Sequence, residues 1–391
     1  MPRKKFRLQF GQILALVAGT ALIALVIFGY LAYQTYTQIS VQARRPFGQK
    51  TSPSPVPTLN PYADRFNEGS PYSIVLMGYG GGTHQGGLLT DSMLLAYIDP
   101  IKETVTLISL PRDLWVGLEE RAGEITHSKI NAAYAIGSDD AKYRQKPVQF
   151  TGPAGGGEMA KAAVTQATGL PVTKFVALNF AGFQKTIDIL GGVEVNVTTA
   201  FDDPLYPIEG KETDPCGKSD EELKAYATMS ATLQEEGFPC RYELLHFDKG
   251  KQLMTGETAL KYVRSRHSAQ DGTDFGRANR QRNLLLAVKD KVFRLDFFPK
   301  IIPFMQSLGG NARTDITLTD MQNMLAFKEA LGKYKITSVA LSEDNVLTIG
   351  RSADGQSIVM PREGIDQWGA VHAWVQQQLV PPVASSSAVV Q

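Results

Sequence analysis

The sequence predicts a mixed α/β (α+β) domain in which a central, mostly β sheet is flanked by helices. Three short apolar runs come first, and segments with a helical spacing of apolar residues then alternate with further strand-like runs. Of the 391 residues, 43% are hydrophobic and 20% are charged, which excludes a collagen, a coiled coil or a wholly disordered chain. We therefore expect one large domain over residues 71–380.

The expected strands are apolar runs that end at glycine, proline or charged residues: 73–77 (SIVLM), 92–99, 104–110, 193–197 (VEVNV) and 336–341. The first three are expected at the centre of the sheet. The expected helices are 158–168, 180–190, 255–263, 276–293, 319–331 and 364–379. Residues 202–241 are polar and are predicted to form an irregular insertion, and residues 381–391 are expected to be disordered.

The amino-terminal region has the features of a membrane anchor. Residues 13–33 are almost continuously apolar, and these 21 residues would span about 31 Å as a helix, enough for a hydrocarbon core of about 30 Å. Four basic residues precede the run: Arg3, Lys4, Lys5 and Arg7. They predict a cytoplasmic tail over residues 1–12 and an extracytoplasmic position for everything after the anchor. A cleaved signal peptide is the alternative, but the run is long for one and no A-x-A site follows it.

Residues 34–70 are rich in proline and serine in their second half and are predicted to form an extracytoplasmic stalk. The two cysteines, Cys216 and Cys240, suit the same location, because an oxidising compartment can join them. A disulfide closing that loop would stabilise the fold by about 3.5 kcal/mol on a chain-entropy estimate. Two unrelated buried thiols are the alternative.

The net charge of +1 divides into two parts. The first twelve residues carry +4, which leaves 36 basic and 39 acidic residues, or −3, for the rest of the chain. A net negative charge on the rest of the chain argues against a broad nucleic-acid-binding surface, although a local basic site can still exist. The spacings of zinc-binding motifs are absent from the sequence.

Two segments that follow strands contain residues suited to an anion. The glycine-rich loop 78–87 offers backbone N–H groups, although it lacks the order of known nucleotide-binding loops, and Asp91 lies just after it. Arg112, in the sequence Pro-Arg-Asp, ends another strand, where ligands gather in α/β sheets. A flexible loop, a turn carboxylate and a surface ion pair are the respective alternatives. Lys129 alone is typical of a solvated surface.

The most unusual segment is 262–282, YVRSRHSAQDGTDFGRANRQR. Arg264 and Arg266 share a face if the chain is extended there, and Asp274 stands where a helix N-cap belongs. Three further polar residues are spaced to share one helical face: Arg277, Arg280 and Gln281. Carboxylates interrupt this arginine cluster, which suits a compact polyphosphate with a metal ion better than a nucleic-acid duplex.

These motifs occur together in the order seen in the LytR-CpsA-Psr family. The sequence resembles that family through Asp91 in LLTDSM, the PRD at 111–113, KINAAY at 129–134, residues 179–197 and the segment 262–281. The resemblance covers about 70–297 and extends more loosely to about 380. It implies a membrane-anchored extracytoplasmic phosphotransferase that moves a teichoic acid-like glycopolymer from a polyprenyl pyrophosphate carrier to peptidoglycan. No nucleic-acid partner is expected.

The resemblance also implies roles for individual residues. It makes Arg112, Arg264 and Arg266 catalytic contacts of the pyrophosphate, and Asp274 a general base or a metal-linked carboxylate. It implies substrate-binding roles for Lys129, Arg277, Arg280 and Gln281, and it makes Asp91 a ligand of Mg²⁺. One departure weakens the expectation of metal, because Gly80 stands where the family's LLGxD motif has an aspartate.

Other interpretations remain open at this point. The same residues would serve a polyprenyl pyrophosphate hydrolase, or a non-catalytic protein that binds lipid pyrophosphate or has a regulatory role. The apolar runs 284–288 and 297–305 are interpreted as ordinary core, with a groove for the polyprenyl chain as the alternative. Glycopolymer, acceptor and oligomeric state are not predicted.

Overall fold

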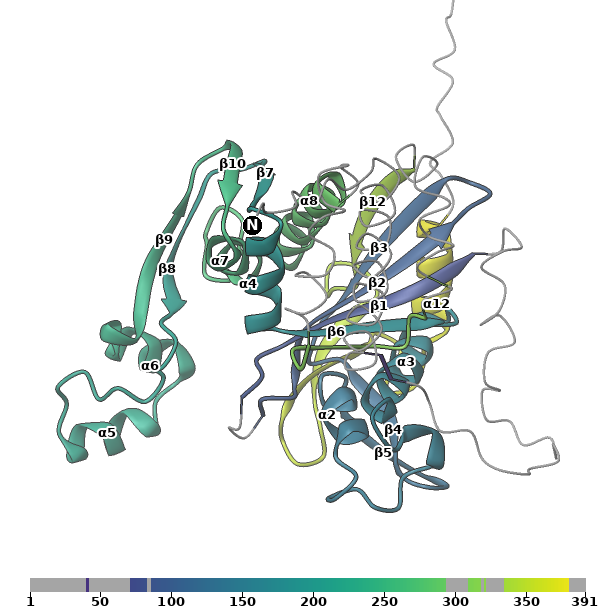
Figure 1. Ribbon diagram of the computed structural model, residues 1–391. Helices are drawn as coiled ribbons and strands as arrows, with labels where there is room; N and C mark the ends of the chain where they lie inside the picture. The colour runs from purple at the N-terminus through teal and green to yellow at the C-terminus, as the bar shows by residue number, and fades with distance from the viewer. Residues whose placement is uncertain are drawn as a thin grey trace, which may run out of the picture.

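A computed structural model describes residues 40–41, 71–82, 86–292, 309–317, 320 and 334–379. Six of the described strands form a mixed sheet with helices on both faces, as the sequence predicts (Figure 1). In spatial order they are β11 (Ala312–Thr314), β6 (Lys174–Asn179), β1 (Tyr72–Tyr79), β2 (Thr90–Asp99), β3 (Thr104–Leu110) and β12 (Lys335–Ala340). The three strands expected at the centre are there, paired antiparallel, whereas β1–β6 and β3–β12 pair parallel.

The apolar sequence of the central strands follows from burial on both sides of the sheet. In β2, Met93 and Leu95 belong to the core on one face, and Leu94 and Ala96 belong to a cluster on the other. Successive side chains of a strand point to opposite faces, so a strand covered on both sides needs a continuous apolar run.

One face is covered by helices α2 (Ala132–Ser138), α3 (Gly155–Thr168) and α12 (Gly369–Gln378). The hairpin of β4 (Trp115–Arg121) and β5 (Glu124–Lys129) lies beside them, with the hairpin of β13 (Leu347–Arg351) and β14 (Ser357–Pro361) next to β4. Helices α2 and α3 pack so closely that glycine is needed at their contact. A Cβ added to Gly155 would lie 2.5 Å from the carbonyl oxygen of Gly137.

The other face carries α4 (Phe180–Ile189), α7 (Gly256–Arg264) and α8 (Asp274–Val292) (Figure 1). These helices share a second apolar core with two antiparallel strand pairs: β7 (Val193–Val197) with β10 (Gly250–Met254), and β8 (Phe201–Pro207) with β9 (Tyr242–Phe247). The space between these helices and the sheet holds the candidate site.

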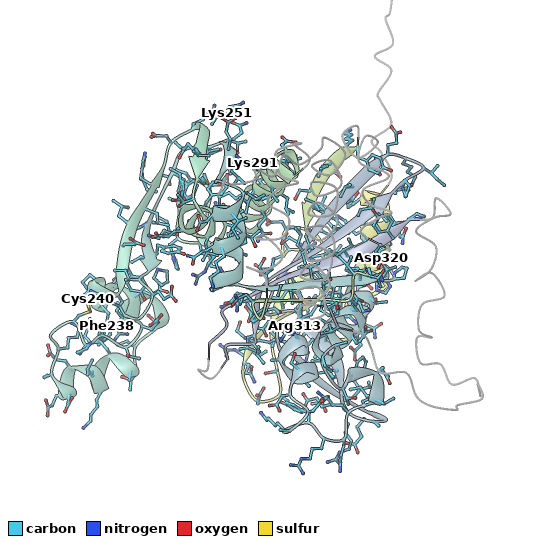
Figure 2. All side chains as sticks on the ribbon, in the orientation of Figure 1. Phe238, Cys240, Lys251, Lys291, Arg313 and Asp320 are labelled. Atoms are coloured by element: carbon cyan, nitrogen blue, oxygen red, sulfur yellow. A yellow bond between two sulfur atoms is a disulfide. The ribbon has the colours of Figure 1, made fainter. Side chains whose placement is uncertain are left out.

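The prediction of an irregular insertion over residues 202–241 is wrong. Strand β8 runs through its start, and α5 (Asp220–Ala227) and α6 (Ala231–Gly237) form a lobe at the far end of the β8–β9 hairpin (Figure 1). A disulfide joins Cys216 and Cys240 within this lobe, as the sequence predicts (Figure 2). The helices were missed because their burial is slight, which leaves little apolar periodicity to detect.

Part of the predicted stalk belongs to the folded domain. Ser40 forms a parallel bridge with Thr314, and the N–H of Val41 donates to the Thr314 carbonyl at 2.8 Å. The Val41 side chain is buried in the main core. The predicted stalk over 34–70 is therefore wrong at Ser40 and Val41. The contact could not be predicted, because a single valine that packs at a sheet edge leaves no pattern in the sequence.

In the described part of the chain, no helix has the length and apolarity needed to cross a membrane. The predicted anchor at 13–33 and basic tail at 1–12 lie outside the described residues, as do the apolar run 297–305, the tail 381–391 and, except for Asp320, the expected helix at 319–331.

Candidate active site

Two adjoining cavities form the candidate site: one lies between the sheet and the helices α4, α7 and α8, and the other lies at the start of β2 and the end of β3, beside α8. The larger has a volume of about 480 Å³ and the smaller about 210 Å³. They share one group of polar lining residues: Asp91, Ser92, Arg112, Arg266, Arg277 and Gln281. Residues from four separate segments of the chain thus meet where the two cavities join. All of them except Ser92 were predicted from the sequence as site residues.

Beyond that polar junction, the wall of the larger cavity is mainly apolar. Strand β6 supplies Val176 and Leu178, helix α4 supplies Phe183, and helix α8 supplies Leu285 and Val288. The run 284–288 is thus more than ordinary core, since Leu284, Leu285 and Val288 line the cavity while Ala287 packs in the second core.

A β-bulge presents Asp91 to the site. Gly78 pairs with Ser92 and Tyr79 with Thr90, so Asp91 is the extra residue of β2 and its carboxylate is exposed. Arg112 donates from Nη1 to Asp91 Oδ1 at 2.9 Å, and its Nε lies 3.5 Å from Asp113 Oδ2. Lys129 lies outside both cavity linings, and its Nζ is 2.7 Å from Asp113 Oδ1. Lys129 therefore supports the carboxylate beside Arg112.

The paired arginines follow the predicted alternation. Ser265 is buried, and Arg264 and Arg266 on either side of it both line the larger cavity. The Arg264 guanidinium lies over the Phe180 ring, 4.2 Å from its centroid, and donates to the Tyr206 hydroxyl at 3.4 Å. These contacts hold its charge at the cavity wall.

Asp203, which no sequence motif indicated, holds the backbone of the segment that carries Arg264 and Arg266. Its buried carboxylate accepts hydrogen bonds from Ser265 Oγ at 2.6 Å and from the Arg266 and His267 N–H groups at 2.9 and 3.2 Å. Burial opposes its charge, yet these hydrogen bonds hold the pKa of Asp203 below its ordinary value. In β8 both Phe201 and Asp203 point inward, but only the structure shows this, because the sequence FDDPLYP has no regular alternation of apolar and polar residues that would indicate it.

Helix α8 brings Arg277 and Gln281 to the junction. The helix begins at Asp274, and Thr273 Oγ1 accepts from the Gly276 N–H at 3.1 Å, so the cap lies one residue before the predicted N-cap. The side chain of Asp274 lies outside the described residues. Gln281 Nε2 donates to Ser92 Oγ at 3.2 Å, which joins α8 to β2.

Arg280 is placed differently from its neighbours, and its expected contact with substrate does not fit this position. It lines neither cavity, and only 1% of its side chain is exposed. Its guanidinium donates to the carbonyl and carboxylate of Asp271 and, at 2.6 Å, to the Ser265 carbonyl. Arg280 thus fixes the loop that carries Arg266.

The glycine loop contributes less than predicted. Gly78 lines the larger cavity, but the Gly81 N–H donates to the Gly87 carbonyl at 2.8 Å and so is already used. Residues 83–85, which include His84, lie outside the described residues. At Gly80, an added Cβ would meet only the Phe180 ring at 3.9 Å, so packing does not require glycine there.

Positive charge is crowded at the junction, an arrangement suited to an anion. Burial, together with repulsion from Arg266, Arg280 and Arg112, lowers the pKa of Arg277 to about 10. Burial and repulsion from Arg112 also lower the pKa of Arg266. The structure therefore keeps like charges close together at a free-energy cost, and a bound polyanion would remove that cost.

This crowding predicts that Arg277→Gln stabilises the free protein while weakening anion binding. A lowered folded pKa means that the charge destabilises the fold fully below pH 10, and that the penalty falls as pH rises above it. At pH 7 the variant should gain about 1 kcal/mol in the free energy of unfolding, measured with urea. Its affinity for inorganic pyrophosphate, measured by calorimetry, should fall at least tenfold. A destabilised variant that still binds would contradict the prediction.

Comparison with known proteins places this chain among its relatives. The sequence profile of the LytR_cpsA_psr family matches residues 30–367. The chain belongs to this family. A LytR-CpsA-Psr relative in Enterococcus faecalis, polyisoprenyl-teichoic acid–peptidoglycan teichoic acid transferase TagU, is 25% identical over 74% of this chain and 75% of its own length. The enzyme of the same name from Oceanobacillus iheyensis is 24% identical over 88% of this chain and 86% of its own.

A solved structure supports the fold of this LytR-CpsA-Psr protein. The structure of protein gbs0355 from Streptococcus agalactiae aligns with 80% of this chain and 89% of its own, with a TM-score of 0.53 and 24% identity. The shared fold agrees with the mixed sheet and flanking helices described above.

Proposed function

We propose that this protein is a phosphotransferase that moves a teichoic acid-like glycopolymer from a polyprenyl pyrophosphate carrier to peptidoglycan. The observation that carries the proposal is the junction of an apolar cavity with a cluster of guanidinium groups. A lipid pyrophosphate has that same composition, a long apolar chain ending in a dense anion. The names of the TagU relatives point to the same donor and acceptor.

The arginines are placed to bind and stabilise the pyrophosphate. Arg112, Arg266 and Arg277 surround the junction, and their N–H groups would donate to its oxygens. An acceptor hydroxyl oxygen attacks the phosphorus on the sugar side, the bond to the bridging oxygen breaks, and polyprenyl phosphate leaves. The guanidinium groups would stabilise the negative charge that grows on this leaving group.

The hydroxyl proton needs an acceptor group in the same place. We propose Asp274, at the start of α8, as the general base or as a carboxylate linked to a metal, as its match to the family motif implies. The products are a phosphodiester between glycopolymer and peptidoglycan, polyprenyl phosphate and the released proton.

We also propose Mg²⁺ as the metal, and the donor atoms at the junction are compatible with it. Mg²⁺ is usually held by one or two carboxylates together with phosphate oxygens and water. The Asp91 carboxylate, exposed at the bulge, would be the protein ligand, and pyrophosphate oxygens would complete the shell. Bound there, the ion would supply positive charge beside the phosphates. The one group of three potential ligands in the described residues, Asp214 with Cys216 and Cys240, is not a comparable site because its sulfurs form a disulfide.

We propose that residues 13–33 anchor the protein in the cell membrane, with the amino terminus cytoplasmic and the catalytic domain outside. The basic residues before this run support the orientation, and the Cys216–Cys240 disulfide supports an oxidising, extracytoplasmic compartment.

The proposal predicts transfer whose efficiency depends on the length of the lipid. Purified protein would be incubated with synthetic glycan-linked polyprenyl pyrophosphates, with or without peptidoglycan fragments, and both products would be measured by mass spectrometry. Glycan joined to peptidoglycan, with a donor KM that falls as isoprene units are added, is expected, because each buried methylene contributes about 0.8 kcal/mol. Release of free glycan phosphate alone would indicate hydrolysis. A KM independent of chain length would contradict the assignment of the apolar cavity.

A further inference from the structure

The proposed transfer requires a second substrate, the sugar hydroxyl that receives the phosphoryl group. In phosphoryl transfer the attacking and leaving oxygens lie roughly in line, on opposite sides of the phosphorus. If the lipid occupies the larger cavity, the acceptor has to approach from the other side of the shared arginines. The smaller cavity has its own lining there, including Asp113, Glu343 and Val359.

A strip of polar and aromatic side chains continues from the smaller cavity along the β4–β5 hairpin. Lys129 contacts Asp113 at the cavity edge and is paired across the strands with Trp115. The next pair on the same face is His127 with Gly117. The opposite face of β4 is in the core, since Val116 and Leu118 are buried. The face with Trp115 is therefore turned away from the core.

The strip has a fixed shape suited to a sugar chain. The rings of Trp115 and His127 are nearly parallel, at 16° with centroids 6.4 Å apart, and His127 Nε2 lies 2.8 Å from Asp366 Oδ2. Beside them the Ile125 side chain packs over Gly117, since a Cβ there would lie 2.7 Å from Ile125 Cγ2. His127 and Asp366 remain partly exposed. A sugar presents an apolar face to an aromatic ring and its hydroxyl groups to neighbouring polar side chains.

We propose that this hairpin strip, formed by Asp113, Trp115, His127, Lys129 and Asp366, binds the glycan strand of peptidoglycan and directs one of its hydroxyl groups into the smaller cavity. The inference rests on the proposed function and adds the place of the acceptor. The strip begins at Asp113, which lines the smaller cavity on the side of the arginine cluster away from the proposed lipid site, and this continuity supports the proposal. Lys129 additionally gives the strip a cation for acidic groups of the acceptor.

The test separates acceptor binding from donor binding. Trp115→Ala should raise the KM for soluble peptidoglycan glycan fragments at least tenfold, while the KM for the lipid donor changes less than twofold. Trp115→Phe, which keeps an aromatic face, should recover most of the acceptor affinity. Leu253→Ala, an exposed apolar truncation on β10, is the matched control and should change neither KM. Circular dichroism and the thermal midpoint would establish that each variant is folded.

A binding measurement without donor makes the test independent of turnover. Glycan fragments should change the tryptophan fluorescence of wild-type protein in a saturable way, and Trp115→Ala should lose that change. Transfer by the wild type with an unaltered acceptor KM in folded Trp115→Ala would overturn the strip and leave the proposed function standing. If the wild type joins no glycan to peptidoglycan, the proposed function fails. The titration then still decides the strip, and the lack of a saturable signal would refute it.

Discussion

Arg112→Ala is expected to lower kcat/KM for glycan transfer by roughly 10²–10³-fold without unfolding the protein. Arg112 lies at the junction of both cavities and separates Asp91 from Asp113 by contacting both carboxylates. The variant loses a donor to the pyrophosphate and leaves the Asp91 carboxylate facing it without its arginine partner, while Asp113 keeps its ion pair with Lys129. Since 40% of the side chain is exposed, its ion pairs stabilise the fold little and the thermal midpoint should hardly change.

Two control variants separate charge from geometry in this experiment. Arg112→Lys keeps the positive charge but loses the planar fork, so an intermediate loss is expected. Arg121→Ala removes an arginine from an exposed ion pair with Glu124 at the hairpin tip and should leave the rate unchanged. Rates would be measured with a synthetic lipid donor and peptidoglycan fragments. Activity of Arg112→Ala within threefold of wild type would rule out the assignment of Arg112.

Arg280→Met is expected to have the largest effect on stability, a loss of about 3–5 kcal/mol in the free energy of unfolding. The buried guanidinium bonds Asp271 and the Ser265 carbonyl, and it lies 4.8 Å from the Phe201 ring centroid. Methionine fills much of the space but leaves the carbonyl of buried Ser265 and the half-buried Asp271 carboxylate without their donor. Because the loop 265–271 carries Arg266, transfer should fall as well.

Urea denaturation would measure this loss, and Arg277→Gln, one turn earlier on the same helix, provides the contrast because it should stabilise. The double variant Arg280→Met with Asp271→Asn removes the unpaired charge and should recover part of the loss. If Arg280→Met is as stable as wild type, the buried contacts do not hold the loop and Arg280 returns to the set of substrate-contact candidates.

Local patterns were sufficient to predict the core strands and the composition of the site. The apolar runs of β1, β2 and β3 require burial on both faces, so their central place could be predicted. The order of the motifs identified Asp91, Arg112, Arg264, Arg266, Arg277 and Gln281, all of which line the larger cavity. The strand prediction depends on neighbouring residues, whose relation is set by the backbone repeat, whereas the site residues were named through the resemblance to the family.

Helical spacing alone misled at Arg280. At about 100° per residue, positions 277 and 281 differ by about 40° around α8, whereas 280 lies about 100° from 281. The three residues therefore share a face only in part, and Arg280 turns toward the loop 265–271. Which side of the helix meets a cavity depends on the sheet opposite, and no periodicity within the helix contains that information.

The sequence by itself determined the fold class, the family and the chemical types of group in the site. Only the tertiary structure decided which groups meet. The bulge exposes Asp91, Asp203 fixes the backbone of the arginine segment, Lys129 supports Asp113 rather than lining a cavity, and Val41 joins the core from the predicted stalk. The physical reason is that these contacts join residues far apart in the chain, and their formation depends on packing of the whole sheet and its helices.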